Sequence, residues 1–128
     1  MIRLLHEDAW FRVEHNPSDA VFRAARSGAP FPDPQTADRA FSALDAALTT
    51  VPRGARLLLD LRDWAPRDDE ELEAMVERVR DRVFARFERV AVLVRAAVGK
   101  RHVQRRIEGQ PAAAIFDDED RAMDHLLA

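Results

Sequence analysis

The sequence predicts an α/β protein built on a single mixed β-sheet with helices packed against it. Two observations carry this prediction. Three short strand patterns separated by turn residues open the chain, and later strand patterns alternate with helical ones. In addition, the apolar run at residues 57–59 lies between turn signals, which is typical of a strand buried on both faces of a sheet. The N-terminal strands should form an antiparallel meander, followed by a β-α-β-α-β-α order.

The meander is expected from strands at residues 2–5, 10–14 and 20–24. Trp10 and Phe11 are neighbours in the second strand, so their side chains should point to opposite faces of the sheet. Only one ring can then enter the core if the other face is open. The ring left outside would need cover from a helix, from the proline-rich loop at residues 27–34, or from a second subunit.

The first helix is expected to begin after Asp33, which can cap it, with Pro34 at its first position. Its apolar stripe consists of Phe41, Leu44, Ala47 and Leu48. The central strand follows at residues 56–61. Asp68 and Glu71 then have the spacing of a capping box for a second helix, whose apolar positions are Leu72, Met75, Val76, Val79, Val83 and Phe87.

The C-terminal part predicts two further strands and two helices. The strands fall at residues 89–95 and 113–116, and a helix between them at residues 100–108 should stop at Gly109. Asp117 is expected to cap the last helix. That helix carries the apolar residues Ala122, Met123, Leu126 and Leu127.

Composition narrows the class of protein. The 128 residues fit one domain spanning 1–128, with 47% hydrophobic residues to build its core. The formal charge of −3 gives no basic footprint for nucleic acid, and cysteine is absent, which excludes disulfides and thiolate chemistry. Apolar stretches are too short to span a membrane, and the first residues lack the apolar core of a signal peptide. A cytoplasmic protein is therefore expected.

Catalytic patterns are missing from the sequence. The four histidines have no metal-ligand spacing, the serines do not lie on a nucleophile elbow, and the four glycines are far apart. We therefore expect no enzyme activity, no catalytic residues, no metal and no cofactor.

The strand end Leu59-Asp60-Leu61 and the helix start from Asp68 to Leu72 resemble the STAS domain superfamily, the fold of bacterial anti-sigma factor antagonists. The order of elements is similar over nearly the whole chain. Residues 87–94 and 115–119 resemble the STAS-like relatives grouped with lipid-binding CRAL-TRIO domains. The resemblance implies a STAS-like fold and a regulatory role in binding another protein.

One departure from the family changes what the resemblance implies. Antagonists of the phosphoswitch class carry a serine at this helix start, whereas this chain has Asp69, Glu70 and Glu71, and no Ser, Thr or Tyr follows Thr50. Serine phosphorylation there is excluded. The carboxylates either mimic a phosphorylated surface, with less charge than a phosphate, or simply favour the positive end of the helix dipole.

Three interaction sites follow as expectations. The leading one is a partner-protein surface with Trp64 and Arg67 as contacts and Asp69 and Glu70 as charge determinants; Trp64 could instead cover the edge of the core. The alternative is a carrier or sensor of a small anionic or lipid ligand, held by Arg101 and Arg105 one helical turn apart; this basic stretch could equally be a solvated face. A homodimer through the N-terminal meander is the third.

Overall fold

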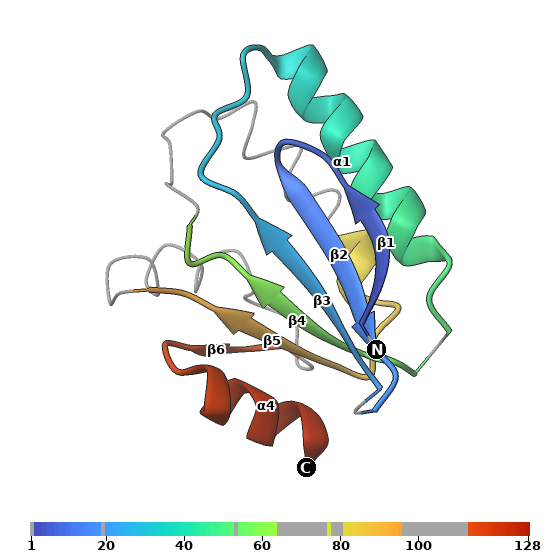
Figure 1. The fold of residues 1–128 in the computed structure, drawn as a ribbon, viewed down its shortest axis with the longest axis vertical. Helices are drawn as coiled ribbons and strands as arrows, with labels where there is room; N and C mark the ends of the chain where they lie inside the picture. The colour runs from blue at the N-terminus through green and yellow to red at the C-terminus, as the bar shows by residue number, and fades with distance from the viewer. Residues whose placement is uncertain (1, 19, 53, 64–76, 78–80, 96–112) are drawn as a thin grey trace.

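The chain folds around a six-stranded mixed sheet, seen here in a computed structural model that describes residues 2–18, 20–52, 54–63, 77, 81–95 and 113–128. The strands follow the order β1-β2-β3-β4-β5-β6 across the sheet (Figure 1). Their bounds are β1 Arg3–Glu7, β2 Phe11–Asn16, β3 Val21–Arg26, β4 Arg56–Asp60, β5 Arg89–Leu93 and β6 Ala113–Phe116.

The antiparallel meander is confirmed, since β1 pairs with β2 and β2 with β3 in antiparallel fashion. The strands from β3 to β6 are parallel to one another. Parallel neighbours need a crossover between them, and helix α1, Pro34–Thr49, lies in the connection from β3 to β4. The prediction of one mixed sheet in an α/β protein is therefore confirmed.

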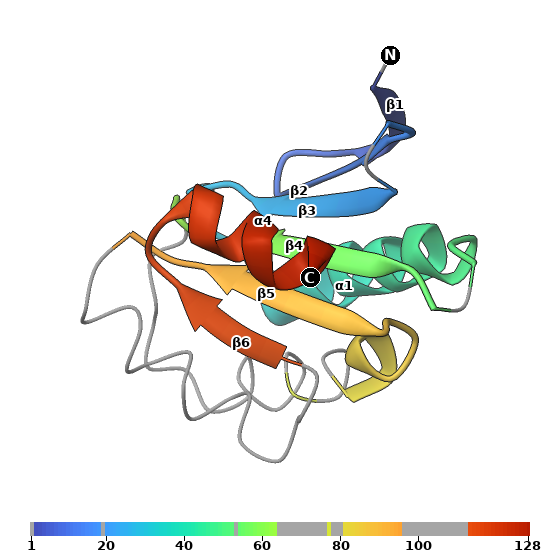
Figure 2. The same ribbon diagram turned by 90° about the horizontal axis from the view of Figure 1, so that it is seen from below.

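Helices cover the two faces of the sheet, as Figure 2 shows for α1 and for α4, Glu119–Leu127. The larger core lies on the α1 side and includes Val13, Leu48 and Leu57, all at most 1% exposed. The smaller core lies under α4, where Leu58, Ala122 and Leu126 are fully buried. Leu57 and Leu58 are consecutive and enter different cores, so β4 is a strand buried on both faces, as its apolar run predicted.

The cap of α1 is confirmed at Asp33, whose Oδ1 accepts the amide of Thr36 at 2.6 Å, with Pro34 in the first turn. The cap predicted for the last helix is wrong by one residue. Asp118, not Asp117, accepts the amides of Asp120 and Arg121. Asp117 lies in the bend that leads from β6 to α4, so the chain needs one more residue before the helix can begin.

Two apolar residues are placed differently from the prediction. Leu127 is 49% exposed, because Ala122 and Leu126 define the buried side of α4. Phe87 is buried, yet it lies beyond the helical residues 81–84, in a stretch where the amides of Arg86 and Phe87 bond the carbonyls three residues back. The capping box at Asp68 and Glu71 and the helix at residues 100–108 fall outside the described residues. Within the described residues, no helix is long and apolar enough to cross a membrane.

The expectation that Trp10 and Phe11 face opposite sides is wrong. Both contact the α1-side core, with Phe11 4% exposed and Trp10 partly buried. Trp10 precedes the first paired residue of β2 and belongs to the turn that Asp8 organises, so strand alternation does not apply to it. The proline-rich loop, one of the three expected covers, packs over Trp10. The ring centroids of Trp10 and Phe31 are 5.5 Å apart, and Trp10 Nε1 donates to the Pro30 carbonyl.

Candidate interaction site at the carboxyl edge of the sheet

The candidate site is the edge of the sheet at which the four parallel strands end. Strands β3, β4, β5 and β6 finish there at Arg26, Asp60, Leu93 and Phe116. Open α/β sheets bind ligands at this edge, because the loops that leave parallel strands gather there. The two segments in which sequence analysis placed candidate sites also leave from this edge, after β4 and after β5.

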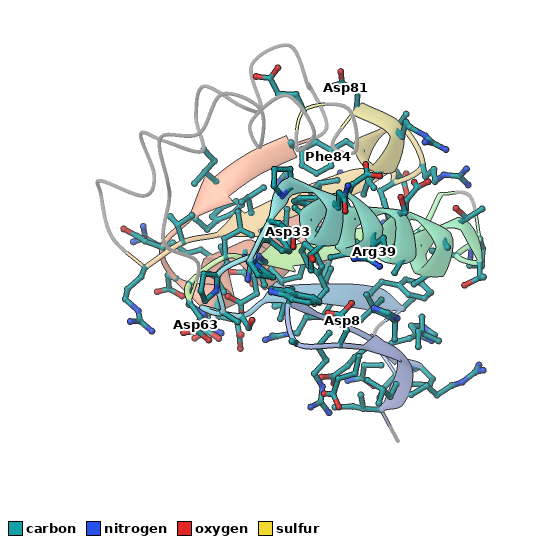
Figure 3. The ribbon with its side chains drawn as sticks, turned by 90° about the horizontal axis from the view of Figure 1, so that it is seen from above. Asp8, Asp33, Arg39, Asp63, Asp81 and Phe84 are labelled. Carbon is teal, nitrogen blue, oxygen red and sulfur yellow. The ribbon has the colours of Figure 1, made fainter. Side chains whose placement is uncertain are left out.

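The predicted site residues themselves lie outside the described part of the chain. This holds for the partner-binding set, Trp64, Arg67, Asp69 and Glu70, and for the ligand-binding alternative, Arg101 and Arg105. The described residues that lead into these segments are Asp63 and Arg95, whose Oδ1 and Nη2 atoms form an exposed ion pair at 3.0 Å. The chain therefore enters both predicted segments from one corner of the sheet, where Figure 3 labels Asp63.

The last residue of β4 is a buried carboxylate. Asp60 is 9% exposed, and its Oδ1 accepts the Arg62 amide at 3.1 Å and Arg62 Nε at 3.0 Å. Its Oδ2 accepts Arg62 Nη2 at 2.8 Å, and Arg23 Nη1 from β3 lies 3.6 Å away. Burial acts to raise the pKa of Asp60, but the hydrogen bonds from Arg62 and the charges of Arg62 and Arg23 outweigh it, so this pKa is lowered.

Helix α4 contributes the fourth member of this group of charges. Glu119, in the first turn of α4, accepts Arg23 Nη2 at 2.6 Å and Arg62 Nη2 at 3.3 Å on the same oxygen, Oε1. We call Arg23, Asp60, Arg62 and Glu119 the strand-end cluster. It holds two positive and two negative charges, and it joins β3, the end of β4, the turn after β4 and α4.

The proline-rich loop approaches the turn after β4 closely at Gly28. A Cβ added at Gly28 would lie 3.0 Å from the Asp63 carbonyl oxygen, so the close approach of these two backbones favours glycine. Near Gly28 in the sequence, Arg26 is buried with its guanidinium 4.5 Å from the centroid of the Phe31 ring. The ring centroids of Phe31 and Phe41 of α1 are 5.6 Å apart. The turn after β4 therefore meets both the strand-end cluster and the proline-rich loop.

Sequence reasoning missed the strand-end cluster. Asp60 was identified only as the end of a strand, although an arginine two residues beyond a carboxylate at a strand end is a readable signal for a local ion pair. Arg23 and Glu119 are far from Asp60 in the sequence, and only the fold brings them to it. The Phe31 ring, in the proline-rich loop, packs against the edge of the α1-side core.

His6 and Asp8 have a structural role in the meander. His6 Nε2 and Asp8 Oδ2 are 2.8 Å apart, and Asp8 Oδ1 accepts the amides of Trp10 and Phe11, which closes the turn between β1 and β2. Within the described residues, no three side chains of the metal-ligating types lie close enough together to hold a metal ion. The described part of this edge holds ion pairs, with the Phe31 ring packed against the core beside them.

Comparisons with known proteins were made at three levels. No protein-family model matches the chain, and neither a curated protein nor a solved structure matches it.

Proposed function

We propose that this chain is a non-catalytic STAS-like regulatory domain that binds a partner protein through the segment after β4, with Trp64 and Arg67 as contacts and Asp69 and Glu70 as charge determinants. The resemblance of residues 59–61 and 68–72 to the STAS motif supports the class. The lack of any Ser, Thr or Tyr after Thr50 makes this a domain without the phosphorylatable serine of the switch class.

The observation that carries the proposal is the fixed start of the proposed binding segment. Leu61 donates its amide to the Leu93 carbonyl at 2.8 Å, Arg62 is held by Asp60, and Asp63 pairs with Arg95. Binding residues are often found on loops that a rigid scaffold positions. A tryptophan directly beyond such a point is well placed to be an interface anchor, since tryptophan and arginine are enriched in binding hot spots.

The test compares partner capture by the native protein with that of the Trp64→Ala and Asp69→Ala variants. Each truncation at a hot spot should weaken binding by about 2 kcal/mol or more, roughly thirtyfold in Kd. The matched control is Glu88→Ala, which removes an exposed carboxylate at the opposite edge of the sheet. Capture that is equal for both variants and the control, with all three folded, would remove the proposed surface.

The alternative of a small anionic or lipid ligand at Arg101 and Arg105 stays a prediction. Native mass spectrometry of gently purified protein would reveal a bound acid or lipid as extra mass. Protein of bare chain mass would remove this alternative.

A further inference from the structure

The strand-end cluster links two parts of the molecule that are distant in the sequence. Arg62 makes hydrogen bonds to Asp60 with its amide, Nε and Nη2, so its side chain and backbone are tied to the end of β4. The same Nη2 reaches Glu119 of α4 at 3.3 Å. Arg62 is also the second residue of the turn that leads to Trp64. One guanidinium therefore contacts both the start of the proposed binding segment and the start of α4.

Arg23 strengthens this link from the neighbouring strand. Its Nη2 is 2.6 Å from the Glu119 oxygen that Arg62 also contacts, and its Nη1 is 3.6 Å from Asp60 Oδ2. Both carboxylates are thus shared by the same two guanidiniums. Side chains in one such network are energetically coupled, because moving one member changes the electrostatic and hydrogen-bonding environment of the others.

Apolar side chains pack helix α4 onto the sheet. Ala122 and Leu126 are fully buried against β4 and β5, with Phe116 and Met123 packed beside them. The cluster lies at the N-terminal end of α4 and is partly exposed: the Glu119 side chain is 42% accessible, and those of Arg62 and Arg23 are 39% and 35%. Partly exposed ion pairs make small contributions, so the cluster can adjust α4 without being what holds it in place.

We propose that Arg62 and Glu119 couple the first turn of α4 to the segment after β4, so that a partner which displaces Arg62 also loosens the start of α4. This regulation rests on the proposed function for its biological use, but the coupling itself is a property of the free protein. Because coupling between two sites is reciprocal, a change at Glu119 must be felt at the turn after β4, and a change at Arg62 must be felt in α4.

Amide hydrogen exchange of the full chain, followed by NMR, tests the coupling in both directions. Glu119→Gln keeps the size of the side chain and removes its charge. We expect the Arg62 amide, which donates to Asp60, to exchange about threefold or more faster in this variant, on the order of the coupling found between neighbouring charged groups. Arg62→Gln should likewise accelerate the Ala122 amide, which donates to the Asp118 carbonyl.

The control is Glu88→Gln, the same substitution in an exposed ion pair with Arg56 at the other edge of the sheet. In this variant the amides of Arg62 and Ala122 should keep their native exchange rates. The slowest amides of β5 report global unfolding and are used to correct each variant. If the exchange rate of the Arg62 amide is unchanged in Glu119→Gln after this correction, the coupling is overturned. If Arg62→Gln does not fold, the Glu119→Gln result alone decides.

Failure of the coupling and failure of the proposed function are distinguishable. Exchange at Arg62 is measured without any partner, whereas partner capture is measured with Trp64→Ala. Coupled exchange with unchanged capture would retain the link between Arg62 and α4 and remove the binding surface. The opposite result would retain the surface and remove the link.

Discussion

Asp60 is the residue on which the candidate site depends most. A carboxylate that is 9% exposed at the end of a strand would be unfavourable without partners, and Arg62 and Arg23 supply the compensating charge. The hydrogen bonds from Arg62 also fix the direction in which the chain leaves β4. A local sequence feature, Asp60 followed two residues later by Arg62, therefore sets the geometry of the edge.

Replacing Asp60 with asparagine should destabilise the protein by about 1–3 kcal/mol at neutral pH, because the guanidiniums of Arg62 and Arg23 lose their carboxylate partner. Urea denaturation of both proteins measures the difference. Arg12→Gln is a suitable comparison, since Arg12 pairs with Glu7 on an exposed surface and its loss should cost less than about 1 kcal/mol. Equal effects of the two substitutions would contradict the role given to Asp60.

The difference in stability between the native protein and Asp60→Asn should also depend on pH. The pKa of Asp60 is lower in the folded chain than its ordinary value, so the folded state resists protonation of this group more than the unfolded state does. Its stabilising contribution is complete above the unfolded pKa of about 3.9 and is lost as pH falls through the folded pKa. The stability gap between the native protein and Asp60→Asn should stay constant from pH 7 to about 5 and shrink below about 4. A gap that widens on acidification would contradict this.

At the level of elements, short sequence patterns predicted the features that neighbouring side chains determine. The cap at Asp33, the stripe of α1 and the apolar run of β4 follow from side chains within one turn or one strand. Where two neighbours can do the same task, as Asp117 and Asp118 can, the sequence does not distinguish them. Trp10 shows a different limit, since its environment is set by Pro30 and Phe31, which lie in another connection.

Helix α4 provides a stability test at this scale. Leu126 is fully buried and Leu127 is 49% exposed, so they differ in environment while sharing the same chemistry and the same helix turn. Leu126→Ala should cost about 2–5 kcal/mol, the usual range for a leucine removed from a packed core. Leu127→Ala should stay within about 0.5 kcal/mol. Chemical denaturation of the two variants decides between this packing of α4 and any other orientation of the helix.

At the level of the whole molecule, the sheet leaves β1 as a terminal strand. Ile2, directly before this strand, and Leu4 within it are 59% and 53% exposed, whereas Trp10 is covered within the chain by the proline-rich loop. The homodimer through the N-terminal meander stays a prediction. Because Trp10 is covered, we expect the dimer contact at the exposed side chains of Ile2 and Leu4 instead. An unprotected terminal strand with exposed apolar side chains is a surface that other chains can pair with.

Light scattering across a concentration series tests this dimer. We expect the native protein to approach twice the chain mass at high concentration and Leu4→Lys to stay at the chain mass while remaining folded. Leu127→Lys introduces the same charge at an exposed leucine on α4 and should behave like the native protein. A native protein that keeps the chain mass at every concentration would end the dimer proposal.

Contacts between distant segments account for what could not be predicted. Residue patterns in one sequence report periodicity and turns, and these predicted the mixed sheet and its alternation with helices. They do not report that Arg23, Arg62 and Glu119 meet, because that meeting needs the order of β3 and β4 and the face on which α4 packs. The predicted site was placed on the segment after β4, while the ion pairs that support it depend on this long-range arrangement.

The most direct test of the central claim is photo-crosslinking from position 64. A benzophenone amino acid at Trp64, which keeps a large aromatic side chain at this position, should capture one partner protein from native cells, and Asp69→Ala in the same chain should strongly reduce the product. The same photoreactive group at position 88, at the opposite edge of the sheet, should give no such product. Crosslinks that are equal from positions 64 and 88, or a product from position 64 that is undiminished in Asp69→Ala, would contradict a partner surface at the carboxyl end of β4.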